Sequence, residues 1–211
     1  GLAGPVFALI EQPSRGWGDP LILATLLVGL ALLAAFAAVE RRAREPMLPL
    51  GLFRERNFAV GNAATLAVYG GLGAVPFFLV LYLQQVAGYD ALEAGLASMP
   101  VTLLMLALSR RFGALADRVG PRAFMGAGPV VAGAGIALFA RIDAEGRYLA
   151  DVLPAVLLFG LGLSLTVAPL TAAVLGGVEE RHAGMASAIN NAVARIGSLL
   201  AVAAIGALVA A

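Results

Sequence analysis

The stretch SRRFGALADRVGPR, residues 109–122, decides the fold that this sequence predicts. It is strongly basic, and it lies between two apolar runs, 94–109 and 123–140, that carry no charge. Such a charged turn is typical of the connection between two membrane-spanning helices, because charged side chains stay at the membrane surface while apolar runs cross the hydrocarbon core. The expected fold class is therefore an all-α polytopic membrane protein.

The composition of the whole chain agrees with this fold. Of its 211 residues 61% are hydrophobic and 13% are charged, and the mean hydropathy is +0.92, which leaves too little polar surface for a water-soluble domain of this length. The run 94–109 is short, so its helix is expected to begin earlier, where Asp90 and Glu93 have the spacing of an N-terminal capping box. We expect a partial helix up to Ile10, and then six full spans near 20–40, 58–85, 91–112, 122–141, 151–175 and 183–211.

Composition also excludes several kinds of function. The net charge is +1 and no basic face is available for a phosphate backbone, so no nucleic-acid partner is expected. The chain has no cysteine, which excludes thiolate metal sites and cysteine nucleophiles. The predicted spans show neither a Ser-His or paired-Asp arrangement for hydrolysis nor an Asp cluster for magnesium. We therefore predict no enzyme, no catalytic residue, no cofactor and no metal site.

The distribution of arginine predicts the orientation in the membrane. Ten arginines fall in the connections on one side and only three, Arg15, Arg141 and Arg147, on the other, where acidic residues accompany them. Because short cytoplasmic loops are enriched in Lys and Arg, the arginine-rich side is the cytoplasmic side. The loops 41–57, 109–122 and 176–182 are therefore expected in the cytoplasm.

A domain boundary is expected between the first two full spans. Pro46 and Pro49 interrupt any continuous helix there, and apolar residues alternate with arginines, so 41–57 is expected to be a cytoplasmic amphipathic linker. It separates an accessory region, 1–40, from a block of five spans, 58–211. A plain amphipathic loop and a regulatory segment are both compatible with this pattern.

The sequence GALADRVGPR, residues 113–122, resembles the signature loop of the major facilitator superfamily. That pattern reads Gly-x-Leu-small-Asp-basic-x-Gly-basic-basic, and Pro121 replaces one basic residue here. The resemblance implies a conformational latch that steadies the outward-facing state, with Asp117 able to cap or neutralise the positive end of the next helix. The alternative is a generic positively charged turn. The latch residues are Gly113, Leu115, Asp117, Arg118, Gly120 and Arg122. Of these, Gly113 is expected to let the helix ends approach closely, and Gly120 to supply a permissive backbone at the turn.

Three further segments, 16–18, 40–50 and 183–191, resemble the fourteen-helix drug:proton antiporters of that superfamily, and the resemblance covers essentially the whole chain. It implies that 1–40 belongs to the extra central helix pair. It also implies that 58–211 is the C-terminal half without its last helix, and that the N-terminal half is a missing partner. The implied function is a plasma-membrane secondary transporter that exports small amphipathic, drug-like compounds by proton antiport with alternating access.

Two polar faces on the predicted spans are candidates for the substrate pathway. Asn62, Thr65 and Tyr69 share one face of the span after the linker, and their alternative role is hydrogen bonding between helices. Asn191 and Arg195 share a face of the last span with two serines. Arg195 is the only charge well inside an apolar run, so it either faces a cavity or snorkels to the surface. Its partner is expected on the missing half or on the substrate.

Two other function classes are alternatives to a transporter. A non-transporting membrane scaffold or receptor is compatible with the composition, but it gives no reason for Asp117 between two spaced glycines. A membrane-embedded enzyme is the less favoured alternative, for the reasons given above. No acid that could carry a proton is found within the predicted spans, so in a proton antiporter such an acid is expected in the absent half.

Overall fold

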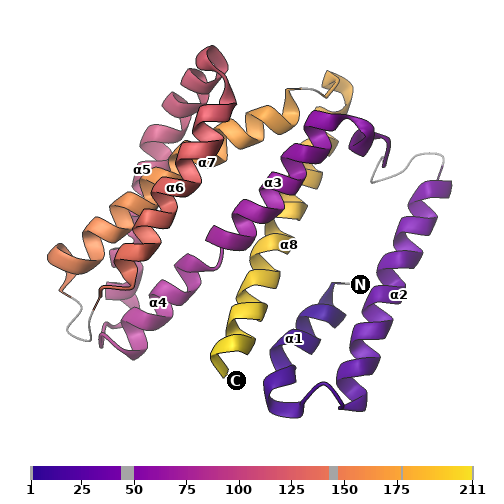
Figure 1. The fold of residues 1–211 in the computed structure, drawn as a ribbon, viewed down its shortest axis with the longest axis horizontal. Helices are drawn as coiled ribbons and strands as arrows, with labels where there is room; N and C mark the ends of the chain where they lie inside the picture. The colour runs from indigo at the N-terminus through magenta and orange to yellow at the C-terminus, as the bar shows by residue number, and fades with distance from the viewer. Residues whose placement is uncertain (1, 44–49, 143–146, 177, 211) are drawn as a thin grey trace. The chain divides into compact units, whose positions relative to one another are not determined.

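The computed structural model describes residues 2–43, 50–142, 147–176 and 178–210, and in these ranges the regular structure is helical throughout. Six helical segments are long and apolar enough to cross a membrane, and a shorter helix precedes them, which confirms the predicted all-α architecture. The elements are α1 Ala3–Arg15, α2 Pro20–Arg42, η1 Leu50–Arg54, α3 Arg56–Leu72, α4 Val75–Gln85, α5 Ala91–Val119, α6 Pro121–Phe139, η2 Tyr148–Val152, α7 Leu153–Leu175, η3 Glu180–His182 and α8 Ala183–Ala210 (Figure 1).

The helices expose much of their apolar surface. Leu106 is 76% exposed and Val130 is 72% exposed, which a protein dissolved in water would avoid but a lipid environment favours. The span that contains α7 differs, since half of its apolar stretch is buried, against 22% or less in the other five. This helix is therefore covered by protein, whereas the others present wide faces to lipid.

The chain divides into two compact units, Gly1–Gly73 with Val178–Ala211 and Ala74–Gly177. We call them unit 1 and unit 2. This division passes through the block 58–211 that the sequence analysis treats as one region. Unit 1 combines the accessory helices α1 and α2 with α3 and α8, because α8 packs against both α1 and α3. The linker prediction falls partly on 44–49, which lie outside the described residues.

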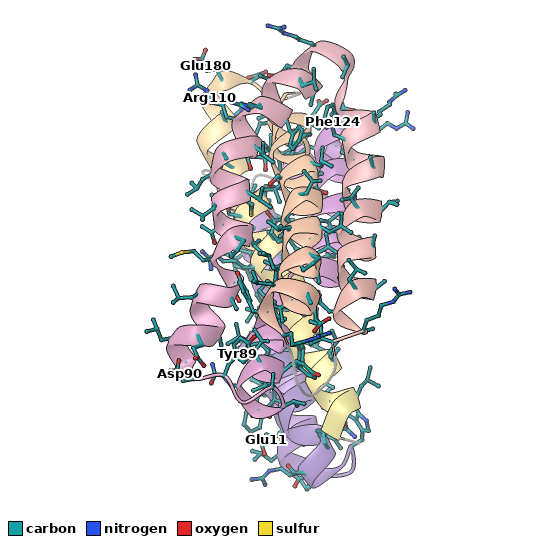
Figure 2. All side chains as sticks on the ribbon, turned by 90° about the vertical axis from the view of Figure 1, so that its left-hand side faces the viewer. Glu11, Tyr89, Asp90, Arg110, Phe124 and Glu180 are labelled. Carbon is teal, nitrogen blue, oxygen red and sulfur yellow. The ribbon has the colours of Figure 1, made fainter. Side chains whose placement is uncertain are left out.

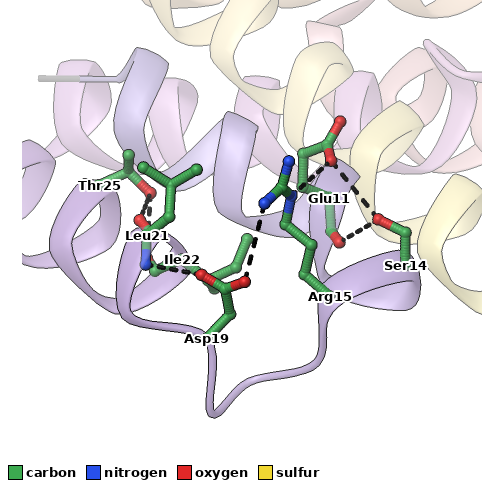
Figure 3. Close-up of polar contacts among 7 residues, drawn as sticks. All are labelled: Glu11, Ser14, Arg15, Asp19, Leu21, Ile22 and Thr25. Atoms are coloured by element: carbon green, nitrogen blue, oxygen red, sulfur yellow. Dashed lines mark hydrogen bonds and ion pairs between the residues drawn. The ribbon is translucent and has the colours of Figure 1, made fainter.

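In unit 1, polar groups fix the connection between α1 and α2 (Figure 3). Asp19 caps α2, since its Oδ1 accepts a hydrogen bond from the Leu21 N–H at 2.7 Å. The guanidinium of Arg15 lies 3.2 Å from a Glu11 carboxylate oxygen and 3.8 Å from Asp19. Gly16 has a φ of 77°, a left-handed conformation that favours glycine, so the chain can reverse here.

In unit 2, α7 packs closely against α5 and α6. Glycines allow the close approach of α6 to α7. A Cβ added at Gly135 would lie 2.8 Å from the Phe159 Cα, and one added at Gly162 would lie 2.6 Å from the Ala132 Cα. Near the start of α7, the Tyr82 hydroxyl donates a hydrogen bond to the Ile142 carbonyl at 3.0 Å. These contacts hold α4, α5, α6 and α7 in one packed unit.

Two element boundaries differ from the sequence prediction. The span expected at 58–85 is divided, because α3 ends at Leu72 and α4 begins at Val75, next to Pro76, whose missing N–H suits the first turn of a helix. The stretch 109–122 is mostly helix, since α5 continues to Val119, so its prediction as a turn is wrong. Between Ser109 and Val119 only Gly113 disfavours helix, and one glycine does not end it.

The start of α5 confirms the predicted capping box. The Asp90 side chain accepts a hydrogen bond from the Glu93 N–H at 2.7 Å, and the Glu93 side chain accepts one from the Asp90 N–H at 2.9 Å. These two bonds satisfy amide groups that the first helical turn leaves without partners. The short apolar run 94–109 is thereby extended into a helix of 29 residues.

Candidate functional site

The α5–α6 junction carries the residues of the predicted latch. Gly120 alone joins the two helices, with a φ of 92°, and its N–H donates a hydrogen bond to the Ala116 carbonyl at 2.8 Å. Pro121 follows at the first position of α6, where its fixed φ is favourable. The prediction that Gly120 supplies a permissive backbone is confirmed. The remaining latch residues lie on the last turns of α5 or on the first turn of α6.

Gly113 has a different neighbour from the one expected. A Cβ added to it would lie 3.7 Å from the Ala168 Cβ on α7, an ordinary contact distance. Gly113 therefore faces α7, and it does not serve a close approach between α5 and α6. Leu115, Arg118 and Arg122 are exposed.

Asp117 is exposed and lines a cavity of about 220 Å³ at the α5–α6 junction. Gly120 and Pro121 line the same cavity, together with Pro169 and Ala172 of α7. Within the described residues Asp117 makes no hydrogen bond or ion pair, so the expected cap on α6 is not formed through a hydrogen bond. The geometry instead leaves this carboxylate available beside a helix N-terminus.

A buried polar cluster joins α3 to α8 within unit 1. The Asn190 side-chain amide donates hydrogen bonds to the Asn62 side-chain oxygen at 3.2 Å and to the Thr65 hydroxyl at 2.8 Å. Asn62 and Thr65 in turn donate to the carbonyls of Phe58 and Gly61 on their own helix, each at 2.9 Å. The structure thus shows hydrogen bonding between helices for two of the predicted pathway residues, which is the alternative considered for them.

Asn190 is the functional candidate that the sequence analysis missed. The polar face predicted for the last span contains Asn191, whereas the buried residue is Asn190, one position earlier. A signal for it existed, because Ala186, Ala194 and Gly197 share its helical face and small residues mark close packing. A Cβ added at Gly197 would lie 2.9 Å from the Leu66 carbonyl oxygen, so α3 and α8 do approach closely there.

The other predicted pathway residues lie elsewhere. Tyr69 is partly buried on α3. Asn191 and Arg195 are exposed on a different face of α8, and the Asn191 amide donates to the Ser187 carbonyl of its own helix at 3.0 Å. Arg195 has no ion pair among the residues that the structure describes. Of the predicted pathway residues, the structure therefore brings together only Asn62 and Thr65.

Comparison with known proteins identifies the family. Residues 2–202 match the family model described as the Major Facilitator Superfamily. The chain belongs to this superfamily. Among its curated relatives, this superfamily member is 35% identical to the puromycin resistance protein of Streptomyces alboniger over 96% of the chain and 41% of the relative. It is 32% identical to the multidrug resistance protein Stp of Mycobacterium tuberculosis H37Rv, over 98% of the chain and 38% of the relative.

A third relative of this superfamily chain is the tetracenomycin C resistance and export protein of Streptomyces glaucescens, which is 30% identical over 97% of the chain and 38% of the relative. The chain thus spans about two fifths of the length of these relatives. The family and the relatives are transporters, not enzymes. With six helices long and apolar enough to span a bilayer, this superfamily chain is a multi-pass plasma-membrane protein.

Proposed function

We propose that the chain forms part of a secondary active transporter, which exports small amphipathic compounds in exchange for protons by alternating access. The observation that carries this proposal is the similarity to resistance and export proteins, which extends over 96% or more of the chain. The packed, membrane-spanning helices supply the rigid bodies that alternating access requires. The substrate class is taken from the printed names of the relatives, which refer to antibiotics and drugs.

Within this proposal the α5–α6 junction acts as the latch. Asp117 presents a carboxylate beside the cavity at the junction and has no partner among the described residues. A basic group from another part of the transporter could pair with it in one conformation only. A contact made in one of two states shifts the equilibrium toward that state, which is how a latch works.

The proposal also covers the substrate pathway and the roles of the domains. Arg195 is exposed on α8 and cationic, so it would attract an anionic substrate group or an acid from another part of the protein. Asn191 and Tyr69 could line the same route. Residues 1–40 would be accessory to transport, with 41–57 as their cytoplasmic linker and 58–211 contributing to the transport machinery.

The test is compound-driven proton movement in inverted membrane vesicles that contain the protein. A proton gradient is established, and puromycin and tetracenomycin C are added in turn while a dye reports the gradient. We expect at least one of them to dissipate the gradient, and the same compound to accumulate in the vesicles. If the protein is inserted in the vesicles and no compound of a broader amphipathic panel is transported, the result would favour a non-transporting scaffold.

The latch is tested by Asp117→Asn, which removes the charge with little change in volume. We expect export to fall at least tenfold while the amount of protein in the membrane stays unchanged. Glu55→Gln is the matched control, because Glu55 is an exposed acid that makes no cap for α3. Equal export by wild type and Asp117→Asn would remove the latch from the proposal without affecting the transport test.

A further inference from the structure

A second cavity lies in unit 2, at the end opposite the predicted latch. It has a volume of about 470 Å³ and is lined by Tyr89, Glu93, Leu96, Ala97 and Tyr148. Figure 2 shows Tyr89 and Asp90 at one end of α5 and Arg110 at the other. The cavity is thus distant along α5 from Asp117, and neither the proposed latch nor the proposed pathway uses it.

Local structure fixes the polar groups around this cavity. Tyr89 directly precedes the N-cap of α5, and Glu93 is held in the first turn by the capping box. Tyr148 begins the helical turn that leads into α7. Two phenol rings and one carboxylate therefore converge from separate segments of the chain, on an apolar floor of Leu96 and Ala97.

The electrostatic surroundings of the cavity are negative. Partial burial raises the pKa of the Tyr89 phenol, and the nearby Glu93 carboxylate, the Tyr148 phenol and the Asp151 carboxylate raise that pKa further. Asp151 Oδ2 is buried and accepts no hydrogen bond, although Arg147 Nε lies 3.6 Å from it. Arg147 itself is largely exposed, so water screens its charge.

We propose that this cavity is a binding site for an alkylammonium group, such as a quaternary or protonated amine of a soluble compound. Aromatic faces attract cations, and the exposed Glu93 carboxylate adds its charge to that attraction. The volume is within the range of small-molecule pockets. The apolar floor would contact the methyl groups of such a cation, whereas a small hydrated metal ion would leave that floor without a partner.

The test measures binding alone, so its outcome is independent of whether the protein transports anything. The chain has four tyrosines, at positions 69, 82, 89 and 148, and each would give one fluorine signal after labelling with 3-fluorotyrosine. The signals are assigned with Tyr→Phe variants. The protein is placed in phosphatidylglycerol nanodiscs, and tetramethylammonium chloride is titrated in at constant ionic strength.

We expect the Tyr89 and Tyr148 signals to shift in a saturable way while those of Tyr69 and Tyr82 stay fixed. The neutral isostere 3,3-dimethyl-1-butanol should give no saturable shift. Glu93→Gln should weaken tetramethylammonium binding fivefold or more, although the glutamine oxygen can still accept the capping hydrogen bond. Asp90→Asn is the matched control, because it removes a charge from the same capping box without lining the cavity, and it should change the affinity less than twofold.

Four results would overturn the assignment. Absence of a saturable shift at Tyr89 and Tyr148 would show that the cavity does not hold the cation, and an equal response to the neutral isostere would show an apolar pocket without cation selectivity. If Glu93→Gln and Asp90→Asn weaken tetramethylammonium binding equally, the cation is attracted by the negative charge of the region and not bound by Glu93 in the cavity. A tenfold weaker apparent affinity in nanodiscs of half phosphatidylglycerol and half phosphatidylcholine than in nanodiscs of half phosphatidylglycerol and half neutral glycolipid, which have the same surface charge, would identify the phosphocholine headgroup as the occupant in place of a soluble cation.

Discussion

At the scale of single residues, two adjacent asparagines on α8 have contrasting surroundings. Asn190 is buried and donates two hydrogen bonds to α3, whereas Asn191 is exposed and bonds only within its own helix. Hydrogen bonds between membrane helices contribute about 0.6 kcal/mol on average and up to about 1.7 kcal/mol each. We therefore expect Asn190→Ala to lower the free energy of unfolding by about 1–2 kcal/mol and Asn191→Ala by less than about 0.5 kcal/mol.

This difference can be measured by unfolding in mixed micelles with increasing SDS. Trp17 is the single tryptophan of the chain and lies in unit 1, so its fluorescence reports on the unit that contains Asn190. A double-mutant cycle with Thr65→Ala should give a coupling energy of about 0.5 kcal/mol or more, because the two side chains share a hydrogen bond. Additive effects in that cycle would contradict the bond between Asn190 and Thr65.

The residue-level predictions from sequence were accurate where the signal was local. The capping box of Asp90 and Glu93 and the special backbone of Gly120 depend on neighbours within a few positions, and the structure confirms both. The partner of Asn62 lies 128 positions away, and no local pattern specifies it. Asn190 and Asn191 are adjacent and lie on neighbouring faces of α8. Because both are polar, helical periodicity alone could not show which of them faces α3.

At the scale of elements, two glycines on α6 differ in what surrounds them. A Cβ at Gly135 would lie 2.8 Å from the Phe159 Cα on α7, whereas a Cβ at Gly133 would meet nothing within 4 Å. Because backbone atoms cannot yield as a flexible side chain can, Gly135→Ala should separate α6 from α7. We expect it to lower the free energy of unfolding by about 1–3 kcal/mol, the usual range for overpacking.

Gly133→Ala is the matched control on the same helix, two positions away. It should leave the stability unchanged or raise it slightly, since alanine favours the helix more than glycine does. Far-UV circular dichroism during SDS unfolding measures both variants on one scale. Equal stability of Gly135→Ala and wild type would show that α6 and α7 are less closely packed than the structure indicates.

Element boundaries show why sequence predicted the number of spans better than their ends. The number depends on apolar runs long enough for a bilayer, and all six are present in the structure. The end of α5 depends on helix propensity in a polar stretch, where hydropathy gives no guidance. Arginines at 110 and 111 mark the membrane surface, but arginine is a good helix former, so α5 continues past them to Val119.

At the scale of the whole molecule, the asymmetry of charge along the helices of unit 2 predicts its orientation in the membrane. Arg110, Arg111 and Arg118 lie near the end of α5, and the acidic residues Asp90 and Glu93 lie at its start. Figure 2 shows Asp90 and Arg110 toward opposite ends of this helix. Arginine in short connections is retained on the cytoplasmic side, so the α5–α6 junction should face the cytoplasm. The cavity beside Tyr89 should then face the outside, where soluble cations reach it directly.

Because the chain has no cysteine, single cysteines can be introduced without removing others. Arg111→Cys and Val119→Cys place a thiol at one end of unit 2, and Gln85→Cys and Arg147→Cys place one at the other; all four positions are exposed. In intact cells a membrane-impermeant maleimide should label the second pair and reach the first pair only after permeabilisation. Labelling of the first pair in intact cells would show that the α5–α6 junction faces the outside. The orientation predicted from the arginine content would then be wrong.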